Sequence, residues 1–156
     1  MIDEITRIRD TERDTIGSEL QDVLTTLIDL SLLGKHAHWN VVGPSFRSLH
    51  LQLDEMVDTW HDAADTVGER IAALGLSPDG RAETVAAGSE LPVLAEGRQP
   101  DSALVASLTG ILTDAVRLVR TPMDRIEHAD PVTADLLHTV VATLEQQLWM
   151  IRAQAA

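Results

Sequence analysis

HWNVVGPSFRSLHLQLD, residues 38–54, is the stretch of the sequence that decides the fold. It joins two helical patterns, because Gly43 and Pro44 interrupt an apolar spacing of three and four residues that holds before and after them. Pro44 followed by Ser45 is typical of the first turn of a helix. We therefore predict one helix that ends near residue 39, a short loop, and a second helix that begins at Pro44.

Outward from this stretch, helical spacing of apolar residues continues in both directions and returns after residue 100. Residues 77–100 combine Pro, Gly and short polar pieces, so we predict a long connection with one short helix near 82–87. Pro122 is expected to kink the third long helix, because it removes a backbone hydrogen bond. The predicted long helices are 11–39, 44–75, 102–127 and 131–153.

Four long helices with one long crossover and short outer loops predict an all-α four-helix bundle. The length of 156 residues fits one domain, with residues 1–10 expected to be a flexible N-terminal segment. Hydrophobic residues make up 44% of the chain but aromatic residues only 3%, which disfavours a β-sandwich.

The chain carries a formal net charge of −13 and contains no cysteine. Such a charge argues against general affinity for nucleic acid or anionic membranes and favours attraction of cations, although simple solubility is the plainer interpretation. Without cysteine there is no disulfide or thiolate metal site. The N-terminus lacks the apolar core of a signal peptide, and no apolar run approaches ~20 residues, so we expect a cytoplasmic protein without a membrane span.

Imidazole and carboxylate side chains recur along the second predicted helix. His50 and Asp54 are four residues apart, as are Asp65 and Glu69, and all four fall on roughly one stripe. The two pairs are about 16 Å apart along the axis, too far to share an ion within one chain. An antiparallel second copy would bring the pairs together, with His38 completing each of two equivalent sites. The alternative is a solvated acidic helix face with incidental histidines.

Three stretches of the sequence are distinctive. They are residues 38–43 (HWNVVG) with Phe46, His50 and Asp54; residues 65–70 (DTVGER), followed by Leu74-Gly75 and Pro78; and residues 148–152 (LWMIR). The first two resemble the two signatures of the Dps family (DNA-binding protein from starved cells), the mini-ferritins, and the third resembles its C-terminal end. Ala64 departs from the family, where a larger apolar residue is usual; this affects packing, not ligation.

The resemblance implies a ferritin-like bundle that assembles as a dodecamer around an iron-mineral cavity. It implies that Fe²⁺ is oxidised, typically by hydrogen peroxide, at ferroxidase sites between paired chains, which protects against oxidative damage. His38, His50 and Asp54 match the ligands from one chain, and Asp65 and Glu69 those from its partner.

Four further residues have a candidate role beside a plain one. Trp39 follows a ligand and is a candidate electron donor, or it packs at the dimer seam. His61 is a candidate secondary metal ligand, or a surface histidine. Asp130 and Asp135 match the region of the family that lines acidic pores for iron, although Asp135 also fits an ordinary acid at a helix N-terminus.

DNA binding in this family usually relies on a lysine-rich tail, and this chain has a single lysine, Lys35. Twelve chains would carry a formal charge of −156 (12 × −13), so we expect weak or absent DNA binding. An intrachain di-metal centre would need Glu-x-x-His pairs, and the sequence contains none. The other alternative is a DNA-compacting or structural cage without ferroxidase activity.

Overall fold

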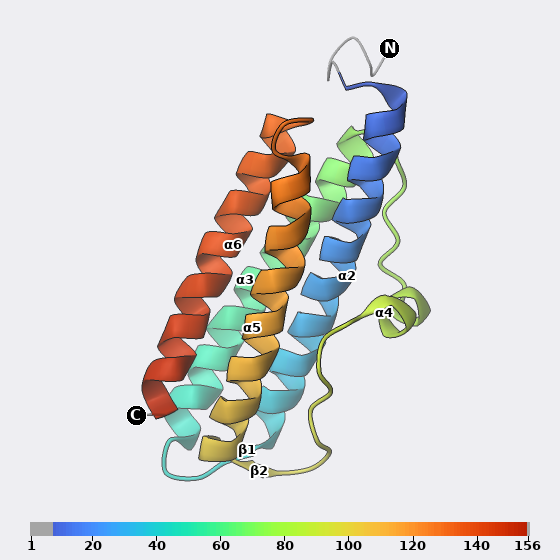
Figure 1. The fold of residues 1–156 in the computed structure, drawn as a ribbon. Coiled ribbons are helices and arrows are strands. Elements are labelled where there is room, and N and C mark those ends of the chain that lie inside the picture. The colour runs from blue at the N-terminus through green and yellow to red at the C-terminus, as the bar shows by residue number, and fades with distance from the viewer. Residues whose placement is uncertain (1–7, 156) are drawn as a thin grey trace.

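The computed structural model describes residues 8–155, and its four long helices lie side by side (Figure 1). They are α2 (Asp10–Asn40), α3 (Phe46–Ala73), α5 (Asp101–Ile126) and α6 (Pro131–Arg152). The short α4 (Ala82–Gly88) lies outside the bundle, on the connection that runs from the end of α3 to the start of α5 (Figure 1). The predicted all-α bundle with a long crossover is confirmed.

The ends of the helices lie within about two residues of the predicted ones, and α5 continues past Pro122 to Ile126. The sequence did not indicate two short strands, β1 (Val41–Val42) and β2 (Gln99–Pro100), which pair in parallel at one end of the bundle. Two residues are too few for an alternating pattern to be recognised. A 3-10 turn, η1 (Ala153–Ala155), follows α6.

The predicted flexible segment, residues 1–10, is described only in part. Residues 1–7 lie outside the described residues. Ile8 is buried against the hydrophobic core, and α2 begins at Asp10. The described part of this segment is therefore tied to the bundle.

The core forms along the apolar stripes of all four long helices. Its largest side chain, Trp60, is almost completely buried, and its indole Nε1 donates to Oε1 of Gln147 at 2.6 Å. This bond links α3 to α6 and gives the indole N–H, its one polar group, a partner that burial would otherwise deny it. Gly34 lets α2 approach α3 closely, because a Cβ at this position would lie 2.5 Å from the Trp60 ring.

Among the helices of residues 8–155, α5 has a length and an apolar composition that would allow it to cross a membrane. Ten of its residues are buried in the bundle, which accounts for its apolar character. A core helix of this kind passes the same test of length and hydropathy.

The crossover is fixed near its start by a pair of hydrogen bonds to α2. The amide of Gln21 donates to the Asp79 carbonyl at 2.9 Å and accepts from the Asp79 N–H at 2.8 Å. The Asp79 carboxylate binds Arg81 and Thr84, and chiefly the bond from Arg81 holds its pKa far below the usual range. The crossover is therefore anchored to α2 near its start by specific hydrogen bonds.

Candidate metal centre

His38 and His50 face each other across the loop between α2 and α3. Their rings stack with centroids 3.7 Å apart and planes 20° from parallel. His38 Nδ1 donates to the backbone carbonyl of His50 at 2.8 Å, and His50 Nδ1 donates to that of His38 at 3.0 Å. The carbonyl of His38 lies in the last turn of α2 and has no helical partner, so the His50 ring closes that helix end.

This reciprocal pair of bonds indicates which tautomer each neutral ring adopts. A carbonyl oxygen can only accept, so Nδ1 must carry the proton in each ring. In the neutral imidazole Nε2 is then left with a free lone pair, which is the form that ligates a metal ion. The end of α2 and the first turns of α3 therefore present two oriented imidazole nitrogens that could ligate a metal ion.

Asp54 lies next to the histidine pair, one helical turn beyond His50. Its Oδ1 is 3.6 Å from His38 Nδ1 and accepts a hydrogen bond from the Lys35 ammonium group. The bond from Lys35 lowers the pKa of Asp54, so the carboxylate is ionised at neutral pH. Its side chain is 45% exposed, which leaves it accessible to a second cation.

Lys35 is the residue of this site that the sequence interpretation missed. It was considered only as the sole lysine, although it precedes His38 by three residues and so falls on the same face of α2. A cation that binds Asp54 must share this carboxylate with the ammonium group or displace it.

Asp65 and Glu69 lie about three and four turns beyond Asp54 along α3, and both are exposed. They border a surface recess of about 510 Å³ with an apolar floor. His61 lies on the same rim. The floor and walls are formed by Leu24, Ile28, Ala64, Gly68, Ala72, Pro78 and Gly80.

One chain does not bring the five predicted ligands together. Within residues 8–155, no three His, Asp or Glu side chains are placed so that they could hold a metal ion. His38, His50 and Asp54 lie near one another without being arranged around a common ion, and we call them the candidate half-site; Asp65 and Glu69 lie apart from them, further along α3. A complete centre would need ligands from a second molecule.

Asp130 and Asp135, the two predicted pore residues, have different surroundings. Asp130 is only 4% exposed, and its Oδ2 accepts hydrogen bonds from Arg70 at 2.7 Å and from Thr133. Burial opposes ionisation, but these bonds outweigh it and lower the pKa of Asp130. This carboxylate ties α3 to α6 within the chain, whereas Asp135 is exposed.

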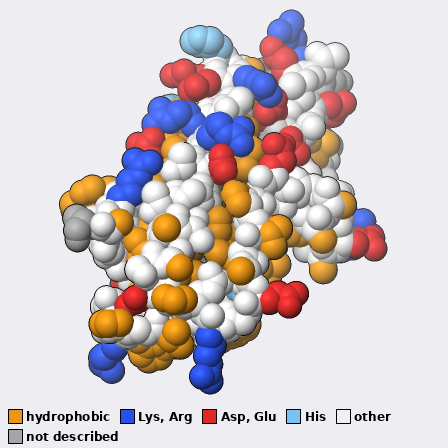
Figure 2. All heavy atoms as spheres, turned by 60° about the horizontal axis from the view of Figure 1, so that its bottom comes forward, with side chains coloured by type: hydrophobic (Ala, Val, Ile, Leu, Met, Phe, Trp, Pro, Cys, Tyr) orange, Lys and Arg blue, Asp and Glu red, His pale blue; other side chains and the backbone are white. Residues whose placement is uncertain are grey.

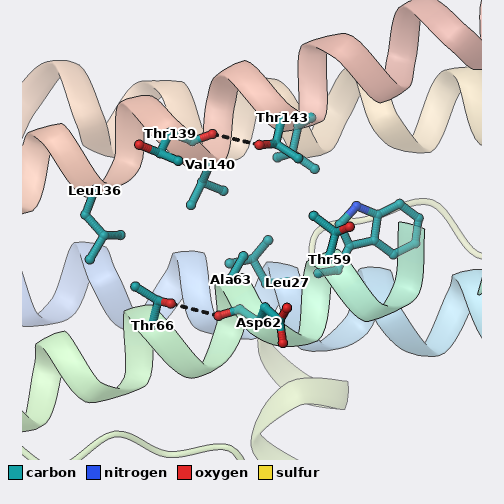
Figure 3. Close-up of a pocket in the computed structure, with 11 residues that line it drawn as sticks. Leu27, Thr59, Asp62, Ala63, Thr66, Leu136, Thr139, Val140 and Thr143 are labelled. Atoms are coloured by element: carbon teal, nitrogen blue, oxygen red, sulfur yellow. Dashed lines mark hydrogen bonds between the residues drawn. The ribbon is translucent and has the colours of Figure 1, made fainter. Parts of the chain in front are cut away.

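A second cavity, of about 340 Å³, lies between α3 and α6 (Figure 3). The hydroxyl groups of Thr66 and Thr143 donate to carbonyls of their own helices, those of Asp62 and Thr139 respectively, so toward a ligand these two oxygens could only accept (Figure 3). The cavity is mainly apolar and contains none of the five predicted ligands. It is not part of the metal centre.

Large apolar side chains are exposed at the end of the bundle that carries the histidine loop, the segment from His38 to His50 that joins α2 to α3. They lie at the end of α2, in β1, at the start of α3 and near the end of α6, which meet there (Figure 1). Figure 2 shows the molecule with this end turned forward, and hydrophobic side chains gather in the lower half of the view. They include Trp39, which is 71% exposed, Val42, Phe46 and Trp149. Exposed apolar groups in such number are typical of a surface that another protein covers.

The chain is similar to known families and proteins over nearly its whole length. A family model for the ferritin-like domain matches residues 18–156. The DNA protection during starvation protein of Mycolicibacterium smegmatis is 34% identical over 146 residues, which cover 94% of this chain and 80% of that protein. The fine tangled pili major subunit of Haemophilus ducreyi is 35% identical over 88% of this chain and 73% of its own length.

Solved structures show the same similarity in three dimensions. Mycobacterium smegmatis Dps in a tetragonal crystal form matches with a TM-score of 0.91 and 33% identity, over 94% of this chain and 89% of that one. DpsA14 from Streptomyces coelicolor matches with a TM-score of 0.91 and 36% identity, over 94% and 88% of the two chains.

Proposed function

Because the chain belongs to the Dps family of ferritin-like proteins, we propose that it oxidises Fe²⁺ and stores the ferric product inside a hollow assembly of its own copies. The observation that carries this proposal is the histidine pair, whose Nε2 atoms are both free to ligate a cation beside the ionised Asp54. Imidazole with carboxylate suits iron better than it suits magnesium or calcium.

The active centre is shared between two chains related by a two-fold axis. His38, His50 and Asp54 of one chain face Asp65 and Glu69 of its partner, because the single chain leaves these groups apart. The apolar recess beside Asp65 and Glu69 supports this arrangement, since it offers a surface that a second chain can bury. The assembly is a dodecamer, and the exposed apolar end of the bundle supplies further contact area.

The reaction balances with hydrogen peroxide as the oxidant. Two Fe²⁺ ions each lose one electron, the O–O bond of the peroxide breaks, and its two oxygens take up two protons and leave as water. Fe³⁺ then moves to the cavity and forms mineral. Peroxide consumed in this way does not produce hydroxyl radicals, so the cell is protected from oxidative damage. Dioxygen is the alternative electron acceptor.

Three residues have accessory roles in this proposal. Asp135 lines a pore through which Fe²⁺ passes, and its exposed carboxylate fits that role better than the buried Asp130 does. Trp39, exposed next to the ligand His38, quenches any radical that escapes the two-electron reaction by donating one electron to it. His61, on the rim with Asp65 and Glu69, takes part in binding a second cation.

Replacing Asp54 tests the proposed activity directly. Asp54→Ala removes the only carboxylate of the half-site, so peroxide-dependent Fe²⁺ oxidation is expected to fall at least tenfold, the lower bound for loss of a group that supports a metal site. Asp58→Ala, one turn further along the same helix, is the matched control and should oxidise iron as the wild type does. Equal rates in wild type and Asp54→Ala would favour a structural cage without ferroxidase activity.

DNA binding is proposed to be weak or absent. The formal charge of −13 per chain and the single lysine, which is engaged by Asp54, leave little attraction for a polyanion. A gel shift with metal-free protein at moderate salt is expected to leave the DNA unretarded, and tight retention would contradict this. We place the protein in the cytoplasm, which fractionation of cells would test.

A further inference from the structure

The carboxylate of Asp101, at the start of α5, lies against the loop that separates His38 from His50. Its Oδ2 accepts a hydrogen bond from the backbone N–H of Ser45 at 2.6 Å, and its Oδ1 accepts one from the N–H of Ser102 at 2.8 Å. One side chain thus joins the first turn of α5 to the residue that precedes α3.

Gly43 makes this contact possible. Its φ is +130°, a conformation that other residues rarely adopt. A Cβ at this position would lie 2.7 Å from the Asp101 carboxyl group, so no side chain fits without displacing it. The loop therefore presents bare backbone to the carboxylate.

Two further ties connect the end of the crossover with the segment that carries the histidines. The strands β1 and β2 pair Val41 with Gln99 and Val42 with Pro100. The Nε2 of His36 donates to the backbone carbonyl of Ala95 at 3.1 Å. Residues 95–101 thus contact the chain before the loop, at its start and at its end, and the contact of Asp101 with Ser45 is the one nearest in sequence to His50.

The spacing between the two histidine rings depends on this loop. Each ring is bonded to the backbone carbonyl of the other residue, so a shift of α3 relative to α2 would break both bonds and turn both Nε2 atoms. Because the loop Val41–Ser45 joins the two helices next to both histidines, its conformation limits such a shift at this end of the bundle. We propose that Asp101 is a positioning residue of the metal centre, which holds the loop so that the His38 and His50 rings keep their stacked, mutually bonded arrangement.

The Asp101 side chain is suited to this role because it is ionised. The N–H group of Ser45 is the main cause that lowers its pKa below the usual carboxyl range. Both carboxylate oxygens accept, one from each side of the junction. An amide of the same shape has only one accepting oxygen, so it must lose one of the two bonds.

Asp101→Asn tests the proposal, with Asp114→Asn as its matched control. Asp114 is also a carboxylate on α5, but its ion pair with Arg117 stays within that helix, and it is not among the residues that form the recess beside Asp65 and Glu69. Co²⁺ is the probe, because its visible absorption reports ligand geometry. Asp101→Asn is expected to weaken Co²⁺ binding about tenfold and to change its spectrum, the lower bound for loss of a group that supports a metal site. Asp114→Asn should leave both unchanged, and both variants should keep the wild-type mass.

Unchanged Co²⁺ affinity and spectrum in Asp101→Asn would overturn the inference. A loss of assembly mass together with affinity would also overturn it, because Asp101 would then be a structural residue only. The inference rests on the proposed function, and its failure can be told apart from that of the function. If Asp101→Asn alters Co²⁺ binding while wild-type protein does not oxidise Fe²⁺, the positioning role stands and the ferroxidase proposal fails.

Discussion

Mixing two inactive variants, His50→Ala and Glu69→Ala, is expected to restore about a quarter of wild-type Fe²⁺ oxidation. In a two-fold dimer each site takes His50 from one chain and Glu69 from the other. A mixed dimer therefore has one site with both defects and one site with none. Half of the dimers are mixed when equal amounts combine at random, and half of their sites are intact.

The measurement needs the two variants to be co-expressed or refolded together, with different tags so that mixed assemblies can be purified. Each variant alone should have the same mass as the wild type and little activity. Refolding His50→Ala with Asp54→Ala is the control, because both defects lie in the same half-site and no mixed dimer regains an intact site. If the first mixture stays as inactive as this control, the centre is not shared between chains.

Asp130→Ala is expected to destabilise the fold by about 3 kcal/mol, because it leaves the largely buried Arg70 guanidinium without its acid. For a chain of this size that corresponds to a fall in melting temperature of roughly 6–12 °C. Thermal denaturation followed by circular dichroism, at one fixed protein concentration, measures it.

The stabilising effect of Asp130 depends on pH, and the direction of this dependence follows from its lowered pKa. The pKa of Asp130 is lowered in the folded state, so its carboxylate stabilises the fold above the ordinary carboxyl pKa of about 3.9. That stabilisation is lost as pH falls through the lower folded pKa, and wild type and variant should converge there. Asp135→Ala is the control, since its exposed carboxylate should affect iron uptake and not melting. A variant Asp130→Ala that melts as the wild type would contradict the structural role of the pair.

The fold was predictable from the sequence because long helices leave a long periodic signal. The helices on both sides of residues 38–54 could be located by apolar spacing and by Gly43 and Pro44. The pairing of β1 with β2 could not, because it involves two residues on each side and depends on where a 24-residue connection returns.

The candidate site was predictable as a set of residues but not as a set of contacts. The spacing of His50, Asp54, Asp65 and Glu69 indicated that the chain alone would not close the centre. The ion pair of Lys35 with Asp54 and the buried pair of Arg70 with Asp130 join residues 19 and 60 positions apart. Such pairings depend on how the helices dock, which a periodic pattern does not encode.

The bonds between each histidine ring and the carbonyl of the other residue restrict which amino acids can occupy these two positions. A carboxylate or a thiolate also binds transition metals, but it has no proton to give to a carbonyl at neutral pH. Exchanging His50 for aspartate would thus keep a metal donor but leave the His38 carbonyl, at the end of α2, without its hydrogen bond, and exchanging His38 would remove the reciprocal bond to the His50 carbonyl. Changing the preferred metal through these two positions therefore also changes how α2 is joined to α3, whereas Asp65 and Glu69, exposed in the second half of α3, can be exchanged for other metal ligands without breaking that connection.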